Sequence, residues 1–271
     1  MRIKKTLLII LILLFAAVFI FSGVVLALEF SKRERDDETF NELADLVLML
    51  DPYEESSGGE QSGLDDENSS NESESEQGTD ETITQKLPHK RNLFPVIEKN
   101  NDCVGWVYIE DTQVNYPVMY TPYEAQKYID KSFDLKSSSY GVPFIEAKCT
   151  PNGDHVVIYG HNMKNGSMFA VIKKYRDKEF FDSHPVIEYE TTEGCRSYTV
   201  IAMCELHAKD KWYSYLNTSD SEEFESQISR ILTRAVQKSD IEIIHGKKLL
   251  TLSTCQGGDD NTRRVLIAIE N

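Results

Sequence analysis

The sequence has no excess of basic over acidic residues. Its 271 residues carry 29 Lys and Arg against 45 Asp and Glu, a formal net charge of −16. The imbalance lies in one segment, because residues 51–85 hold 12 acidic residues and no Lys or Arg, whereas residues 86–271 are close to neutral, with 26 acidic and 23 basic residues. Nucleic-acid-binding proteins usually show a basic patch or stripe. Nucleic acid is therefore not an expected partner.

A second absence is that of any charged residue between positions 7 and 28. A helix needs about 20 apolar residues to cross the hydrocarbon core of a bilayer. Arg2, Lys4 and Lys5 precede this run, and such clusters stay in the cytoplasm. We expect a cytoplasmic N-terminus over 1–5, a transmembrane anchor over 6–28, and the rest of the chain outside the cell. A cleaved signal peptide is the alternative, but its apolar core usually has about 7 to 15 residues.

Paired cysteines at CxxC spacing are also missing. The five cysteines are an odd number in an exported chain, so at least one is free or pairs between molecules. Without CxxC pairs a zinc site or a thioredoxin-like motif is not expected, and the scattered acidic residues are typical of a solvated surface. We predict no metal and no cofactor. A disulfide among the cysteines remains open.

The rest of the chain divides into three parts by composition. Residues 29–50 repeat apolar side chains at steps of three and four, which predicts an amphipathic juxtamembrane helix that either packs on the folded domain or lies on the membrane. Residues 51–85 are rich in Ser, Glu, Gly and Asn, and they cannot bury enough surface to offset the entropy of ordering. They are predicted to be a disordered acidic linker that acts as a tether. Residues 86–271 form the folded domain.

The folded domain is predicted to be mostly β. Eight short apolar runs separated by turn residues indicate a closed or nearly closed barrel. The expected strands are Val104–Ile109, Val114–Val118, Val142–Ile145, Val156–Tyr159, Val186–Tyr189, Tyr198–Cys204, Leu249–Thr254 and Val265–Ile269. The expected helices are few and peripheral: Tyr123–Ile129, Phe169–Tyr175 and Ser221–Val236, the last begun by a capping pair, Asp220 and Glu223.

Two reactive side chains stand at predicted strand ends. Cys255 ends the run TLSTC, where the chain opens into a Gly- and Asp-rich turn, and His161 follows another strand in YGHNMKNGSMF. A cysteine at such a position is exposed enough to react. A buried structural cysteine is the alternative reading. Arg263 and Arg264 follow Cys255 on the neighbouring strand, and only one of the two can face it because side chains alternate along a strand.

These motifs, together with NDCVGW and VNYPV farther upstream, make the chain resemble the sortases, specifically class B. The resemblance covers about 170 residues from Asn101 to the C-terminus, and it implies an eight-stranded sortase-type barrel with a helix between the sixth and seventh strands. It further implies that residues 86–271 are the catalytic domain of a membrane-anchored cysteine transpeptidase.

For the site, the resemblance implies Cys255 as nucleophile, His161 as its proton-transfer partner and Arg263 as the oxyanion donor. Ser253 and Thr254 are expected to line the substrate groove. The implied substrates are surface proteins with a C-terminal sorting motif cleaved after Thr, and the acceptor is an amine of a cell-wall precursor or a pilin lysine. A cysteine protease or hydrolase, and a non-enzymatic redox or binding barrel, are the alternatives.

Overall fold

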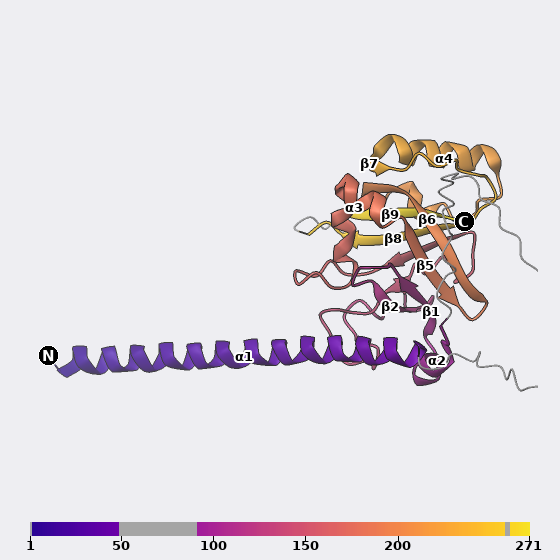
Figure 1. The fold of residues 1–271 in the computed structure, drawn as a ribbon. Helices are drawn as coiled ribbons and strands as arrows, with labels where there is room; N and C mark the ends of the chain where they lie inside the picture. Colours follow the sequence, from indigo (N-terminus) through magenta and orange to yellow (C-terminus); the bar gives the residue numbers. More distant parts are fainter. Residues whose placement is uncertain (1, 49–90, 258–260) are drawn as a thin grey trace, which may run out of the picture.

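A computed structural model describes residues 2–48, 91–257 and 261–271, and of residues 2–10 the backbone only (Figure 1). Nine strands form one sheet in this part of the chain. The elements are α1 (Arg2–Leu48), α2 (Phe94–Lys99), β1 (Cys103–Tyr108), β2 (Asn115–Met119), β3 (Phe144–Ile145), β4 (His155–Tyr159), the 3-10 helix η1 (Phe169–Arg176), α3 (Lys178–Ser183), β5 (Val186–Thr191), β6 (Gly194–His207), the 3-10 helix η2 (Lys211–Ser214), α4 (Ser221–Arg234), β7 (Ala235–Lys238), β8 (Leu249–Cys255) and β9 (Thr262–Glu270).

Eight of these strands close into a barrel. Their order is β5-β1-β2-β3-β4-β8-β9-β6, and a further pairing of β5 with β6 completes the ring. Closure removes the unpaired edges that an open sheet would present. The interior is filled by large apolar side chains such as Trp106, Val118 and Ile158, which are fully buried. The predicted eight-stranded barrel with few helices is confirmed.

A ninth strand, β7, was missed because it follows a helix without a break. The helix α4 begins as predicted, with Asp220 accepting a hydrogen bond from the Glu223 N–H at 2.8 Å. It was expected to reach Val236 but ends at Arg234, and residues 235–238 pair with the distal half of β6. The long strand β6 has room for this pairing because β5 occupies only its proximal half.

The predicted helix Tyr123–Ile129 is wrong. The segment forms a series of turns with hydrogen bonds between residues three apart, such as Lys127 N–H to the Glu124 carbonyl at 2.8 Å. Tertiary contacts explain the difference. The fully buried Tyr128 and its neighbour Lys127 both bind the Asp102 carboxylate at 2.7 Å, which fixes the local backbone against its helical propensity. The predicted helix at 169–175 is present as the 3-10 helix η1.

The apolar N-terminal segment is the start of one continuous helix, α1. An 18-residue window of it has a mean hydropathy of 3.0, and none of that window is buried, so it is long and apolar enough to cross a membrane. The same helix continues through the segment predicted to be amphipathic, and its C-terminal end lies against the barrel beside α2 (Figure 1). Phe40, Leu43 and Val47 are buried in that contact. Of the two alternatives for this segment, packing on the folded domain is the one observed.

The chain leaves and re-enters the fold at one place. The Asn92 N–H donates to the Val47 carbonyl oxygen at 3.0 Å, so the two ends of segment 49–90 are adjacent. The predicted acidic linker at 51–85 lies within this segment, outside the described residues. Its role as a tether stays a prediction, and the described helix α1 by itself joins the apolar segment to the barrel.

Because Val47 and Asn92 are hydrogen-bonded to each other, we predict that the segment between them can be shortened without loss of stability. Replacing residues 51–85 with a Gly-Ser link of about ten residues should leave the melting temperature unchanged or raise stability by at most about 1 kcal/mol, since a shorter loop costs less closure entropy. Thermal unfolding of the two full chains in detergent measures this. A drop of several degrees would show that the linker contributes contacts to the fold.

Candidate active site

Cys255 is the last residue of β8 and is half-buried. Across the antiparallel ladder its Cα partner on β9 is Arg263. The Gln256 N–H donates to the Thr262 carbonyl at 3.1 Å, so the turn between the two strands starts directly beyond this pair. Residues opposite each other on paired strands project to the same face of a sheet. The fold therefore puts a guanidinium beside the thiol.

Arg264 occupies the other face of β9. Its Cα partner is Thr254, its Nη1 donates to the Gln256 carbonyl at 2.9 Å, and its Nε lies 3.4 Å from Glu205 Oε1. Of the two arginines, Arg263 lines the cavity that contains Cys255, and Arg264 is not among the lining residues of the described chain. Arg263 is therefore the arginine on the face of the sheet that carries Cys255, and its role as oxyanion donor stays a prediction.

The pairing of β4 with β8 brings His161 to the cavity that contains Cys255. The two strands run parallel with Tyr159 opposite Ser253, and the Gly160 N–H extends the ladder to the Ser253 carbonyl at 3.1 Å. His161 and Cys255 each follow that pair by two residues, and both line the same cavity. At Gly160 a Cβ would come within 2.7 Å of the Phe169 ring, so only glycine fits at the position before the histidine.

The His161 ring is held by a backbone acceptor. Its Nε2 lies 2.6 Å from the Ile129 carbonyl oxygen. A carbonyl only accepts hydrogen bonds, so Nε2 carries the proton and Nδ1 is the nitrogen available for proton exchange. The next residue, Asn162, donates from Nδ2 to the Cys255 carbonyl at 3.0 Å. The histidine loop and the cysteine strand are thus joined by a direct hydrogen bond.

The cavity shared by these side chains has a volume of about 350 Å³. Its other lining residues come from the turns at 125–129, from the segment 140–147 that contains β3, from strands β4 and β8 and from the connection after β6. They include Tyr128, Ile129, Tyr140, Val142, Phe144, Tyr159, Ala208, Tyr213, Ser253 and Thr254. A cleft of this size with apolar walls and a few polar groups at one end is typical of a peptide or small-molecule site.

The two residues predicted to line a substrate groove do contact the cavity, but both are buried. The Ser253 hydroxyl is 2.9 Å from the Tyr213 hydroxyl, and the Thr254 Oγ1 has no hydrogen-bond partner among the described residues. Burial raises the pKa of Tyr213, which keeps its hydroxyl protonated. Contact of Ser253 and Thr254 with a substrate stays a prediction.

Two sets of contacts fix the segment that carries Tyr213. One set is to β8 and the other is to α4. The indole of Trp212 donates to Thr251 Oγ1 at 2.9 Å, and the buried His155 contacts the same hydroxyl at 2.8 Å. Burial lowers the pKa of His155 to about 4, so it is neutral at physiological pH. Thr251, Ser253 and Cys255 are every second residue of β8, so their side chains lie on one face of the strand. The connection after β6 therefore buttresses the strand that ends in the cysteine.

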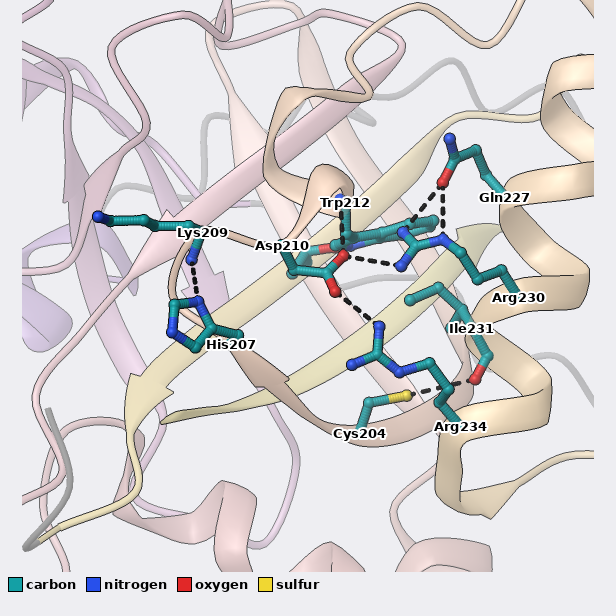
Figure 2. Close-up of polar contacts among 10 residues, drawn as sticks. Cys204, His207, Lys209, Asp210, Trp212, Gln227, Arg230, Ile231 and Arg234 are labelled. Atoms are coloured by element: carbon teal, nitrogen blue, oxygen red, sulfur yellow. Dashed lines mark hydrogen bonds and ion pairs between the residues drawn. The ribbon is translucent and has the colours of Figure 1, made fainter. Parts of the chain in front are cut away.

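Asp210 joins this connection to the helix α4 (Figure 2). Its carboxylate accepts the Trp212 N–H at 2.9 Å and forms ion pairs with Arg230 at 2.9 Å and with Arg234 at 2.6 Å. Burial opposes ionisation, but the Trp212 N–H and the two guanidinium groups together hold the pKa of Asp210 below its usual range. Because three donors bind this one carboxylate, the connection after β6 is held in one position against α4.

We predict that Asp210→Asn lowers the free energy of unfolding by about 1 to 2 kcal/mol, as measured by denaturant unfolding. The amide oxygen can still accept the Trp212 N–H, but the amide nitrogen replaces the oxygen that accepts from Arg234, so the change removes the charge and that one acceptor. The Asp210 side chain is only 8% exposed, but both arginines are more open, which reduces the effect relative to a fully buried pair. The control is Asp182→Asn, which removes the exposed pair with Lys178 and should cost less than about 0.5 kcal/mol. Equal effects would contradict a structural role for the Asp210 cluster.

All five cysteines are free in the structure, and all lie in the described ranges. Burial raises the pKa of Cys103, Cys195 and Cys204 to about 12 and that of Cys149 to about 11, so these four thiols are protonated and unreactive. Among the described residues there is no group of three or more His, Cys, Asp or Glu that could hold a metal ion.

Sequence reasoning missed several residues that form the site. Tyr213, Tyr140 and Ala208 line the cavity from segments that carry no motif, and the Ile129 carbonyl binds the histidine. The only local signal was the aromatic pair Trp212-Tyr213 in a polar connection. Asn162 belongs to the motif around His161, but its bond to the Cys255 backbone becomes visible only when the two strands are paired.

Fold and site together define a closed mixed β-barrel with a cysteine, an arginine and a histidine around one cavity at its rim. The family model of the sortase domain matches residues 107–270, which is more than half of the chain. The chain therefore belongs to the sortase family. The resemblance predicted from the motifs is confirmed.

Two relatives that are similar over most of the barrel carry the name Sortase B. The protein of Listeria monocytogenes is 31% identical over 165 residues, which cover 59% of this chain and 65% of the relative, slightly less than two thirds of its length. The protein of Staphylococcus aureus is 27% identical over 185 residues, covering 66% of this chain and 74% of the relative.

Solved structures agree with the fold. Sortase B from Bacillus anthracis, in complex with AAEK1, has a TM-score of 0.65 at 23% identity and covers 89% of this chain and 98% of its own. Sortase B from Listeria monocytogenes has a TM-score of 0.57 at 29% identity and covers 66% of this chain and 99% of its own.

Proposed function

We propose that this protein is a membrane-anchored cysteine transpeptidase that attaches exported proteins to an amine. The observation that carries the proposal is the direct opposition of Cys255 and Arg263 on β8 and β9, in the cavity that His161 also lines. Family membership and the similarity to proteins named Sortase B support it. A solved sortase B-substrate complex of Staphylococcus aureus, 22% identical with a TM-score of 0.61, shares the fold.

In the first half-reaction Cys255 transfers its thiol proton to His161, and its sulfur attacks the carbonyl carbon of Thr in a C-terminal sorting motif. The charge that develops on the carbonyl oxygen receives hydrogen bonds from Arg263, whose planar guanidinium offers several donors in a fixed fork. The C–N bond then breaks, and the leaving amine takes a proton from His161. The product is a thioester between the surface protein and the cysteine.

In the second half-reaction an amine attacks the thioester carbonyl. His161 accepts the proton that the amine loses, the C–S bond breaks, and the thiolate is restored while a new amide joins the two partners. The acceptor is an amine of a cell-wall precursor or a pilin lysine. A solved structure of Sortase B complexed with triglycine, 23% identical with a TM-score of 0.61, supports a peptide amine for this role.

The apolar part of α1 is proposed to anchor the enzyme with its N-terminus inside the cell and the barrel outside. The first α1 side chain buried on the barrel is Asp36, eight residues after Leu28. That separation corresponds to about 12 Å along a helix. A continuous helix over so short a distance would hold the cavity close to the outer membrane surface, where exported substrates emerge.

Ligation by the full-length protein in detergent tests the function. We expect a peptide that contains a sorting motif to be joined to triglycine through a thioester on Cys255, detected by mass spectrometry. Cys255→Ala should reduce the rate by about 10⁴-fold or more, because a nucleophile is not replaced by its neighbours. Hydrolysis alone, with every acceptor, would indicate a cysteine hydrolase. Full activity of Cys255→Ala would reject both enzyme hypotheses, because both use Cys255 as the nucleophile. Neither ligation nor hydrolysis by the wild type would leave a binding or redox barrel.

The two adjacent arginines provide a matched pair of variants. Arg263→Ala should lower kcat/KM by about 10² to 10³, the usual cost of one oxyanion donor. Arg264→Ala should have a much smaller effect, because its guanidinium binds the Gln256 carbonyl and Glu205 away from the cavity. Arg263→Lys, which keeps the charge without the fork, should fall between them. Steady-state kinetics measures these losses of kcat/KM. A larger loss in Arg264→Ala would assign the role of oxyanion donor to Arg264.

A further inference from the structure

The C-terminal part of α1 contacts the barrel through polar groups as well as apolar ones. Asp36 is 2% exposed and accepts a hydrogen bond from the Ser138 hydroxyl at 2.5 Å. Asp37 accepts one from the Tyr140 hydroxyl at 3.3 Å. Burial raises the pKa of the Asp36 carboxyl group, and partial desolvation raises that of Asp37, which is an exposed residue at the edge of the contact. Placing a carboxylate such as that of Asp36 in an interface is unfavourable unless it is hydrogen-bonded, so these contacts favour one orientation of the helix on the barrel.

One connection runs from Asp37 to the loop that follows His161. Tyr140 is 1% exposed and lines the active-site cavity, and its hydroxyl also accepts a hydrogen bond from Asn165 Nδ2 at 2.6 Å. Asn165 Oδ1 in turn accepts from the Ser167 hydroxyl at 2.8 Å. The carboxylate of α1 and the amide in the histidine loop thus share one tyrosine hydroxyl.

A second, separate connection runs from Phe40. Its ring packs edge-on against the Tyr116 ring, with 5.1 Å between centroids, and the Tyr116 hydroxyl accepts the Met168 N–H at 3.0 Å. Met168 has a left-handed backbone with φ of 57°, which a residue with a side chain adopts only when its surroundings hold it there. The following N–H, that of Phe169, donates to the His161 carbonyl at 2.8 Å and closes the loop.

Between the helix and this loop lies a cavity of about 370 Å³, lined by Asp37, Phe40, Asn115, Asn165 and Ser167 among others. Tyr140 and Tyr116 bridge the helix and the loop beside this space. The loop is joined at its other end to the cysteine strand, through Asn162 and the Cys255 carbonyl.

We propose that Asp37 and Phe40 of the membrane helix are positioning residues for the active site: through Tyr140 and Tyr116 they fix the 162–168 loop and, with it, the place of the His161 ring relative to Cys255. The inference rests on the proposed role of His161 in proton transfer. The part of α1 that packs on the barrel would then help to set the active-site geometry. The orientation of the anchor and the position of the His161 ring would be coupled.

Kinetics of the full-length protein in detergent separates positioning from folding. We expect Asp37→Ala and Phe40→Ala each to lower kcat by about 5- to 100-fold, the range that a small misplacement of a reacting group produces. KM for the sorting peptide should stay within about twofold, because proton transfer and not binding is affected. Glu38→Ala, an exposed neighbour on the same helix, is the matched control and should behave as wild type.

Tyr140→Phe tests the first connection without removing the ring that lines the cavity. It should lower kcat at least as much as Asp37→Ala, because it also removes the hydrogen bond from Asn165, and the double variant should lose no more than Tyr140→Phe alone. Additive losses, or a rise in KM with unchanged kcat, would overturn the positioning role.

Hydrogen exchange provides a readout that needs no activity. Asp37→Ala and Phe40→Ala should speed exchange of the Met168 and Phe169 amides at least about tenfold, with little change for amides of β8 and none in Glu38→Ala. If wild type fails to ligate but exchange responds in this way, the proposed function fails and the structural coupling holds. Wild-type exchange and wild-type kcat in both α1 variants would reject the inference.

Discussion

The parallel pairing of β4 with β8 is the constraint on which the site depends. Five residue pairs, from His155 opposite Leu249 to Tyr159 opposite Ser253, set the register of the two strands. A shift by one residue would turn every side chain to the other face of the sheet. His161 and Cys255, 94 positions apart in the chain, come together because each lies two residues beyond the last pair of that ladder.

Two supports hold this ladder from opposite sides of the barrel, where Figure 1 shows α4 and α1. On the α4 side, Asp210 fixes the connection whose Trp212 and Tyr213 bind hydroxyls of β8. On the α1 side, two tyrosine hydroxyls bind the loop after β4. The barrel supplies the register, and the peripheral elements fix the polar groups at its rim. A barrel with a rigid interior can carry such a site on loops because the loops themselves are bound at several points.

Much of the fold could be predicted from local pattern. Alternating apolar runs gave the eight barrel strands to within a few residues, and the pair Asp220 and Glu223 marked the start of α4. The errors fall where non-local contacts overrule local preference. Tyr128 and Lys127 bind Asp102 and prevent the helix expected at 123–129, and pairing with β6 converts the predicted end of α4 into β7. Such partners are distant in the chain, so no window of sequence contains them.

The apolar segment, the positions of the strands along the chain and the residue types of the site follow from the sequence alone. They depend on hydrophobic periodicity and on motifs that are continuous in the chain. Other features arise only in the folded chain: Arg263 faces the cysteine and Arg264 the opposite side, Val47 meets Asn92, and α1 reaches the histidine loop. Each of these is a pairing between backbone segments far apart in sequence. Their geometry follows from the register of a closed sheet, and that register is a property of the whole barrel.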